Sequence, residues 1–339
     1  MNVTIKNGDC RTVLKELPSE SVQCVVTSPP YWGLRDYGHA DQIGLEPTPQ
    51  AYVETMRQVF AEVWRVLRDD GTVWLNLGDS YARMQENNVP QSKNRECVPP
   101  SGTGRIKNAG LKPKDLVGIP WRVAFALQAD GWYLRSDIIW HKPNPMPESV
   151  TDRCTKSHEY IFMLTKSAKY YFDAEAIMEP AAYGEQHANK TTSWGPNGKM
   201  ADNGIGKSNR EKYEFKGDNH TCHNSACTPG QTPQGKALKR MSGESDEVYF
   251  VRNKRDVWTV QTAPCKEAHF ATFPPDLIKP RILAGTKPDD VVLDPFGGSG
   301  TTGMVALELG RQAILIELNP EYAKLCDERC ATTPGLALA

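Results

Sequence analysis

The residues Val25-Val26-Thr27-Ser28-Pro29-Pro30-Tyr31-Trp32 join a strand pattern to an abrupt stop. The β-branched run over 22–27 is typical of a buried parallel strand, and the two prolines end it because neither can donate a hydrogen bond to a sheet. Ser28 and Tyr31 therefore follow the carboxyl end of a strand. Ligands bind at that end of an open α/β sheet, so the stretch predicts a site, or else a proline-rich turn.

Strand and helix patterns alternate on both sides of this stretch, which is typical of a parallel α/β sheet with right-handed crossovers. The predicted strands are 3–6, 22–27, 72–77, 133–141, 160–164, 291–293 and 313–316. The predicted helices are 10–17, 51–67, 120–130, 274–283, 301–309 and 320–330. Strands 133–141 and 160–164 are separated by a tight return, which favours an antiparallel pair at one edge of the sheet.

The composition is that of a globular protein of 339 residues with a net charge of -1. Mean hydropathy is -0.54, no apolar run is long enough to span a membrane, and the N-terminus lacks a signal-peptide pattern, so we expect a cytoplasmic protein without a membrane partner. Nine scattered cysteines indicate reduced thiols. Residues 83–115 and 190–255 are locally basic despite the neutral total, as expected of surfaces that contact phosphates.

The pattern of regular elements also divides the chain. Residues 1–169 carry one regular half, interrupted by a polar loop at 81–115 that we expect to be mobile. Residues 170–264 are rich in Gly, Asn, Ser, Thr and Lys and predict no long helix, which indicates an inserted module. The regular pattern returns over 265–330, and the small apolar tail 331–339 is expected to fray.

A second constellation lies near the C-terminus, where a strand, a glycine turn, a helix and a strand lead to Glu317. Glycines let a backbone approach a ligand closely, and an acidic side chain at the next strand end accepts hydrogen bonds from ribose hydroxyls. Asp294 precedes the turn and would repel a pyrophosphate. It favours a cofactor with a cationic or neutral tail, such as S-adenosylmethionine with its ammonium and sulfonium groups.

Together the two motifs resemble those of the exocyclic-amino DNA methyltransferases, in the permuted order called the β group. The resemblance implies a permuted, Rossmann-like S-adenosylmethionine-dependent methyltransferase sheet, mostly parallel with one antiparallel strand. It also implies that 170–264 is a target-recognition region and that double-stranded DNA with a specific short sequence is the partner. A homodimer is a tendency of the resembled family, and the sequence does not give the oligomeric state. By position it assigns catalysis to Ser28, Pro29, Pro30 and Tyr31, and cofactor binding to Asp9, Phe273, Asp294, Phe296, Gly297, Gly298, Gly300, Thr301 and Glu317.

The resemblance also gives these residues roles. Asp9 would approach the cofactor's adenine, Glu317 would hold its ribose, and the segment 269–274, which contains Phe273, would close over its methionine end. Ser28 and the Pro29 carbonyl would accept hydrogen bonds from the amino group of a flipped base, and Tyr31 would stack on its ring. Serine at position 28 favours N4 of cytosine as the target, with N6 of adenine as the alternative.

Other readings of the chain remain as alternatives. It could methylate RNA or a protein glutamine, or be an inactive DNA-binding relative. Methylation of a ring carbon would need a cysteine nucleophile, and the only Pro-Cys pair, Pro264-Cys265, lies beside no recognisable pocket element. His220, Cys222, His223 and Cys227 do not have the spacing of a common zinc finger, so we expect no metal.

Overall fold

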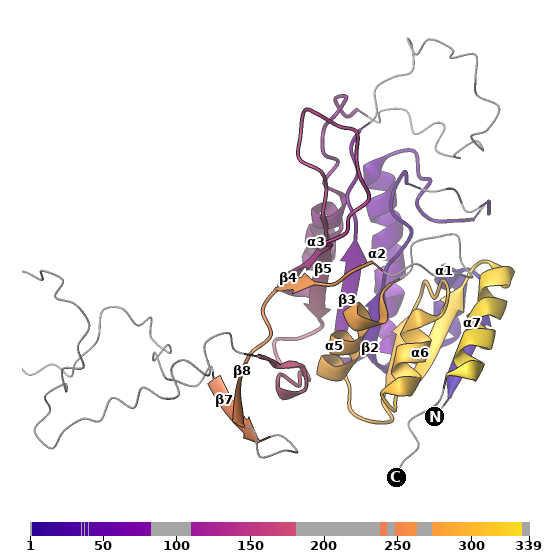
Figure 1. Ribbon diagram of the computed structural model, residues 1–339. Helices are drawn as coiled ribbons and strands as arrows, with labels where there is room; N and C mark the ends of the chain where they lie inside the picture. The colour runs from indigo at the N-terminus through magenta and orange to yellow at the C-terminus, as the bar shows by residue number, and fades with distance from the viewer. Residues whose placement is uncertain are drawn as a thin grey trace, which may run out of the picture. The chain divides into compact units, whose positions relative to one another are not determined.

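The computed structural model describes residues 2–34, 36, 38–39, 41–82, 110–180, 238–242, 248–262 and 273–333 (Figure 1). The chain divides into two compact units, Met1–Ala176 with Arg255–Ala339, and Ile177–Lys254. Within the second unit, β8 (Val248–Arg252) pairs antiparallel with β7 (Leu238–Ser242) and with β6 (Glu179–Pro180).

The first unit is built on an eight-stranded sheet in the order β1-β11-β10-β2-β3-β5-β4-β9. Its strands are β1 (Val3–Asn7), β2 (Val22–Thr27), β3 (Leu67–Leu77), β4 (Tyr133–His141), β5 (His158–Thr165), β9 (Val257–Thr259), β10 (Val291–Asp294) and β11 (Gln312–Glu317). Neighbours pair in parallel except β5, which is antiparallel to both β3 and β4. The predicted mostly parallel sheet with one antiparallel strand is confirmed. The permuted order is also confirmed, because β1 lies beside the C-terminal β11.

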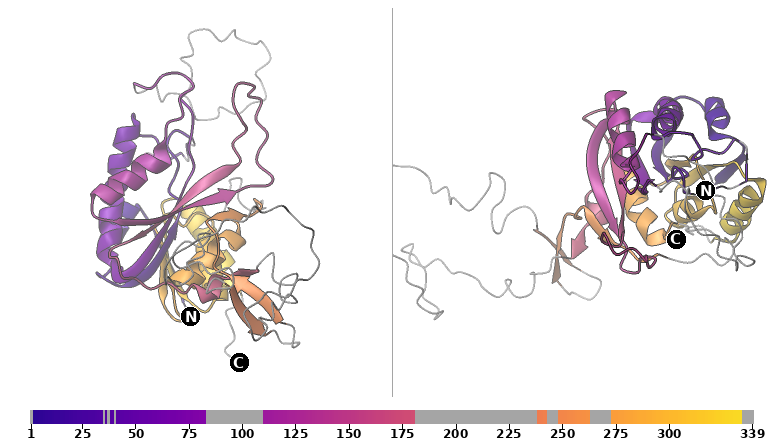
Figure 2. Two further views of the ribbon diagram at one scale, coloured as in Figure 1. Left: turned by 90° about the vertical axis from the view of Figure 1, so that its left-hand side faces the viewer. Right: turned by 90° about the horizontal axis from the view of Figure 1, so that it is seen from above.

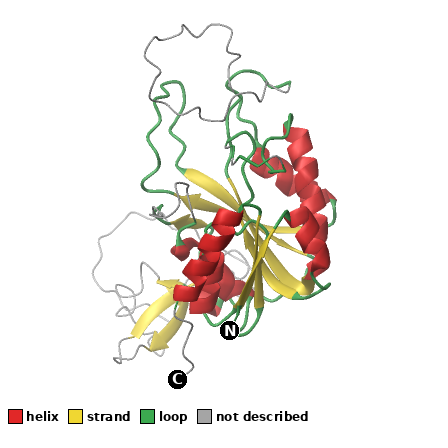
Figure 3. Cartoon of the chain, turned by 90° about the vertical axis from the view of Figure 1, so that its right-hand side faces the viewer, coloured by secondary structure: helices red, strands yellow, loops and turns green. Residues whose placement is uncertain are grey.

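Helices cover both faces of this sheet, as the two views in Figure 2 and the cartoon in Figure 3 show. On one side are α1 (Cys10–Val13) with the 3-10 turn η1 (Leu14–Glu16), α2 (Pro49–Val66) and α3 (Ile119–Ala129). On the other, α6 (Thr301–Glu308) packs between α5 (Pro275–Gly285) and α7 (Pro320–Thr332). A further 3-10 turn, η2 (Glu175–Ile177), lies at the boundary between the two units.

Helix α2 illustrates how the sequence sets these elements. Thr48 caps it by accepting a hydrogen bond from the backbone N–H of Ala51 at 3.0 Å, and Pro49 occupies the first turn, where it displaces no hydrogen bond. Apolar residues at helical spacing then form one fully buried face. These residues are Tyr52, Met56, Val59, Phe60 and Val63. They enter the core between α1, α2, α3 and the sheet.

Three local differences from the sequence prediction have physical causes. The predicted helix 10–17 has only four α-helical residues before it tightens into η1. Strand β3 begins at Leu67, where the prediction still placed helix, because Leu67 pairs with Val22 of β2 before a register shift. The predicted antiparallel pairing of β4 with β5 is confirmed, but its predicted position at the sheet edge is wrong, because β9 pairs with β4 and forms that edge.

Several sequence predictions concern residues outside the described ranges. They are most of the loop 81–115, most of the region 170–264 with His220, Cys222, His223 and Cys227, the pair Pro264-Cys265, residues 269–272 and the tail from 334. Among the described residues, no group of three or more His, Cys, Asp or Glu side chains could hold a metal ion. In the same ranges, no helix is both long enough and apolar enough to cross a membrane.

Candidate active site

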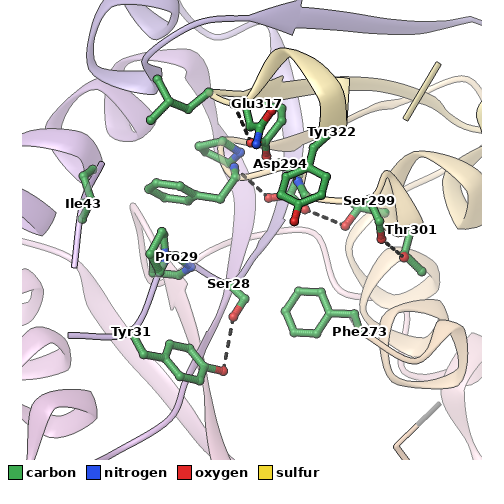
Figure 4. Close-up of a pocket in the computed structure, with 18 of the residues that line it drawn as sticks. Ser28, Pro29, Tyr31, Ile43, Phe273, Asp294, Ser299, Thr301, Glu317 and Tyr322 are labelled. Atoms are coloured by element: carbon green, nitrogen blue, oxygen red, sulfur yellow. Dashed lines mark hydrogen bonds between the residues drawn. The ribbon is translucent and has the colours of Figure 1, made fainter. Parts of the chain in front are cut away.

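One pocket of about 560 Å³ opens at the sheet edge where the parallel strands end. Its volume lies within the roughly 300–1,000 Å³ usual for small-molecule sites. The pocket brings together the candidates from both ends of the chain (Figure 4). It is lined by Ser28, Pro29, Pro30, Tyr31, Asp9, Phe273, Asp294, Phe296, Gly297, Gly298, Thr301 and Glu317. Of the predicted site residues, Gly300 alone is absent from this lining.

A direct contact between the two motifs explains why they meet. Strand β10 pairs with β2, and the Thr27 hydroxyl donates to Oδ1 of Asp294 at 2.7 Å. The Thr302 hydroxyl donates to Oδ2 at 2.7 Å, and the Phe296 backbone N–H donates to Oδ1 at 3.1 Å. Burial nevertheless raises the pKa of Asp294 to about 7. Asp294, which precedes the glycine turn, therefore also links β10 to β2 through its hydrogen bond with Thr27.

Glu317 holds the glycine turn from the neighbouring strand. Its carboxylate accepts hydrogen bonds from the backbone N–H groups of Gly298 and Asn319, each at 2.8 Å, and burial raises its pKa. Its backbone carbonyl accepts from the N–H of Gly8 at 2.9 Å. Asp9 follows and caps α1, where it pairs with Arg11. Burial alone would raise the pKa of Asp9, but the hydrogen bonds from Arg11 lower it.

Gly300 supports this turn from outside the pocket. It precedes α6 with φ at +82°, and a Cβ built on it would lie 3.0 Å from Cα of Cys326 in α7. Both the positive φ and this close approach require glycine. Gly300 therefore sets the distance between the turn and α7, and it does not line the pocket.

We expect Gly300→Ala to destabilise the protein by about 1–3 kcal/mol and to weaken cofactor binding, because the added methyl group pushes the turn away from α7. Thermal unfolding and equilibrium titration with S-adenosylmethionine measure the two effects. Gly38→Ala is the matched control, since Gly38 has φ at +79° with no atom within 4 Å of a Cβ. Equal destabilisation by the two variants would contradict the role of crowding at Gly300.

A buried polar network surrounds the catalytic candidates. The Ser28 hydroxyl donates to Oη of Tyr31 at 3.3 Å, and Tyr31 donates to Oε2 of Glu159 at 2.6 Å. Asn76 Nδ2 donates to both Tyr31 Oη, at 2.6 Å, and Glu159 Oε2, at 2.7 Å. Lys142 forms an ion pair with the other oxygen of Glu159. Burial and the adjacent Glu159 carboxylate raise the pKa of Tyr31 well above its usual value.

Glu159 and Asn76 are functional-site residues that sequence reasoning missed. Asn76 lies within the predicted strand 72–77, whose pattern indicates only a buried strand. The structure shows that Asn76 is fully buried and that its amide belongs to the network. Glu159 precedes the predicted strand 160–164. Because β5 runs antiparallel, the beginning of this strand lies at the edge where the others end. The direction of β5 was the signal that could have found Glu159.

The pocket wall beside this network comes from the end of β4 with the residues after it, and from Phe273, which precedes α5. The Lys142 ammonium lies 4.3 Å from the centre of the Trp140 ring, and Asn144 Oδ1 accepts from the backbone N–H of Thr262 at 3.1 Å. Across the pocket, the Phe273 ring faces Ser28 (Figure 4). Behind it the fully buried Arg281 guanidinium lies 5.3 Å from the Phe273 ring centre, and burial lowers the pKa of Arg281 to about 9.

Comparison with known proteins accounts for this arrangement. A family model described as DNA methylase matches residues 22–328. The chain belongs to this DNA methylase family. It is 46% identical over 330 residues to the Type II methyltransferase M.XycI of Xanthomonas campestris pv. cyanopsidis, with 96% of this chain and 87% of the relative covered. It is 43% identical over 327 residues to the Type II methyltransferase M.SmaI of Serratia marcescens, with 95% and 88% covered.

Solved structures share the fold of this DNA methylase. The PvuII DNA methyltransferase, described as cytosine-N4-specific, matches with a TM-score of 0.59 at 18% identity, covering 97% of this chain and 86% of the other. The putative DNA modification methylase TTHA0409 of Thermus thermophilus, solved in complex with S-adenosyl-L-methionine, matches with a TM-score of 0.53 at 22% identity, covering 98% and 95%. The DNA methylase family uses S-adenosylmethionine, which agrees with the cofactor predicted from the glycine turn.

Proposed function

We propose that this DNA methylase transfers a methyl group from S-adenosylmethionine to N4 of a cytosine that has left the DNA duplex. The observation that carries the proposal is the shared pocket, in which Ser28 and Pro29 stand at the end of β2 beside the glycine turn and Glu317. A base held by Ser28 and Pro29 would meet a cofactor held by the glycine turn and Glu317. Positioning of this kind supplies much of the rate of a group transfer.

The pocket residues fit the chemical groups of S-adenosylmethionine. The Glu317 carboxylate accepts two backbone hydrogen bonds and retains lone pairs for ribose hydroxyls. Asp294 supplies negative charge for the cationic methionine end, and Asp9 lies on the pocket wall for the adenine amino group. Bound there, the cofactor supplies an electrophilic methyl group. The chain itself has to bind the base and orient its amino group.

An exocyclic amine is a weak nucleophile because its lone pair is delocalised into the ring of the base. Hydrogen bonds from its two N–H groups to Ser28 Oγ and to the Pro29 carbonyl would favour a pyramidal nitrogen with a localised lone pair. The Tyr31 ring would lie against the base. Extrusion from the duplex is required, since a stacked base cannot bring its amino group to the cofactor.

Cytosine is proposed over adenine on the strength of Ser28. Serine at the first position of the catalytic motif is the more usual residue in cytosine-N4 members of the resembled family, whereas aspartate or asparagine is more usual in the adenine-N6 members. The fold neighbour described as cytosine-N4-specific is in keeping with this choice. We further propose that the unit Ile177–Lys254, which interrupts the catalytic unit in sequence, contributes to recognition of a specific DNA site.

The test is to identify the methylated nucleoside. Purified protein is incubated with duplex DNA and methyl-labelled S-adenosylmethionine, and the DNA is digested to nucleosides that are separated by chromatography. Label in N4-methyldeoxycytidine supports the proposal, and label in N6-methyldeoxyadenosine overturns the choice of base. Transfer to RNA or protein only, or no transfer by a protein that binds the cofactor, would overturn the proposed activity.

A further inference from the structure

We propose that Glu159 fixes the direction of the hydrogen bonds in the active site, so that the Ser28 hydroxyl presents lone pairs, not its proton, to the amino group being methylated. This inference rests on the proposed function. Glu159 is a positioning residue in this scheme, because it acts on the base through Tyr31 and Ser28. The proposal follows from counting protons along the network.

An ionised carboxylate can only accept hydrogen bonds. Glu159 Oε2 therefore receives the proton of Tyr31 Oη at 2.6 Å and a proton of Asn76 Nδ2 at 2.7 Å. It also fixes the orientation of the Asn76 amide, because the opposite orientation would place an amide oxygen against a carboxylate oxygen. Asn76 Nδ2 then donates its second proton to Tyr31 Oη at 2.6 Å.

Tyr31 has a single hydroxyl proton, and it is used on Glu159. Tyr31 Oη can therefore only accept from Ser28, whose Oγ lies 3.3 Å away. The one proton of Ser28 points towards Tyr31, and both lone pairs of Ser28 Oγ remain for donors in the pocket. The amino group of a base carries such donors. If the chain of hydrogen bonds ran the other way, the Ser28 proton would point at the N–H groups and oppose their binding.

The surroundings of Glu159 keep it ionised, as it must be if Ser28 donates to Tyr31 and Tyr31 donates to Glu159. Burial by itself raises the pKa of Glu159, but the Lys142 ammonium and the donors Tyr31 and Asn76 outweigh it, so that its pKa is below the usual value. Lys142 directly follows β4, and Glu159 lies in β5 opposite Trp140 of β4, so the pairing of the two strands brings the two charges together. The antiparallel strand β5 thus supplies the carboxylate that contacts Tyr31.

Glu159→Gln is the direct test because glutamine has almost the same shape. Its amide can donate to Tyr31, which frees the Tyr31 proton for Ser28 and turns the Ser28 proton towards the pocket. We expect the single-turnover rate of methyl transfer to fall about 100-fold, the size of effect seen when one oriented active-site hydrogen bond is lost. The dissociation constants of S-adenosylmethionine and DNA should change by less than about threefold, because these contacts are retained.

A double-mutant cycle with Tyr31→Phe separates this role from a structural one. Phenylalanine has no hydroxyl, so the chain of hydrogen bonds from Glu159 to Ser28 is already broken. In that background Glu159→Gln should slow transfer by no more than about twofold. A 100-fold loss in both backgrounds would overturn the proposal, because it would mean that Glu159 acts through folding or through Lys142. Unchanged transfer by the single variant would also overturn it.

Glu16→Gln serves as the matched control, since Glu16 is an exposed carboxylate paired with Lys6 outside the pocket. Its transfer rate should equal that of the wild type. The wild-type rate on DNA is measured first. Absence of transfer by the wild type contradicts the proposed function, whereas an active wild type with an equally active Glu159→Gln variant contradicts only the role of Glu159.

Discussion

Ser28→Ala is expected to reduce the rate of methyl transfer by about 10²- to 10³-fold, the loss typical of removing one oriented group that stabilises a transition state. Alanine removes the only side-chain acceptor that the catalytic motif offers to the amino group, and the Pro29 carbonyl alone cannot hold both N–H groups. Among the described residues, the half-buried hydroxyl forms a side-chain hydrogen bond to Tyr31 alone, at 3.3 Å. Folding should therefore be little affected.

The rate is measured in single turnover with methyl-labelled cofactor, beside equilibrium binding of S-adenosylmethionine. Cofactor affinity should stay within about threefold of the wild type, because Glu317 and the glycine turn are unchanged. Ser21→Ala is the control, since the Ser21 hydroxyl donates to the Pro18 carbonyl away from the pocket. A rate within tenfold of the wild type would contradict the assignment of Ser28 as the acceptor of the amino group.

Much of the fold followed from local pattern. The β-branched run ended by two prolines predicted β2 with its observed bounds, because burial in a parallel sheet and loss of the N–H donor both act over a few residues. The resemblance to permuted methyltransferases then placed the last two strands beside the first. The pairing of β10 with β2 and the bond from Thr27 to Asp294 follow from that order.

The parts of the site that could not be predicted depend on contacts between distant residues. Glu159 faces Tyr31 only because β5 is the strand that runs antiparallel to β3, and the tight return predicted an antiparallel pair without indicating which of its two strands runs against the sheet. Likewise β9 is three residues long, too short for a pattern, and exists because β4 offers it a free edge. Gly300 matches the cofactor motif by position, but a sequence motif does not show which atoms each residue contacts, so its close approach to Cys326 of α7 could not be predicted.

Asp294→Asn is expected to stabilise the protein at alkaline pH and to weaken binding of S-adenosylmethionine. The pKa of Asp294 is raised to about 7 in the folded protein, from 3.8 as the ordinary value. The unfolded chain therefore loses this proton at lower pH than the folded one. The contribution of Asp294 to the stability of the wild type should be highest below about pH 4 and fall by up to about 4 kcal/mol as pH rises to about 7, above which it should level.

Asparagine keeps the geometry without the charge. Its oxygen can accept from Thr27 and the Phe296 N–H, and its amide can donate to the Thr302 hydroxyl, so the pH-dependent loss attributable to this residue should disappear. Chemical denaturation between pH 4 and 9 measures this, with the exposed Asp327→Asn as control. The same slope in Asp294→Asn and wild type would contradict the argument.

The affinity for S-adenosylmethionine should depend on pH in the opposite direction from the stability that Asp294 contributes. A cationic ligand favours the ionised carboxylate, so wild-type affinity for S-adenosylmethionine should increase as pH rises to about 7, with release of a proton on binding, and Asp294→Asn should lack this dependence. Calorimetry in two buffers of different ionisation enthalpy detects the proton. Asp294 would then destabilise the unliganded protein in order to hold a cation, as expected of a buried charge kept for function and not for folding.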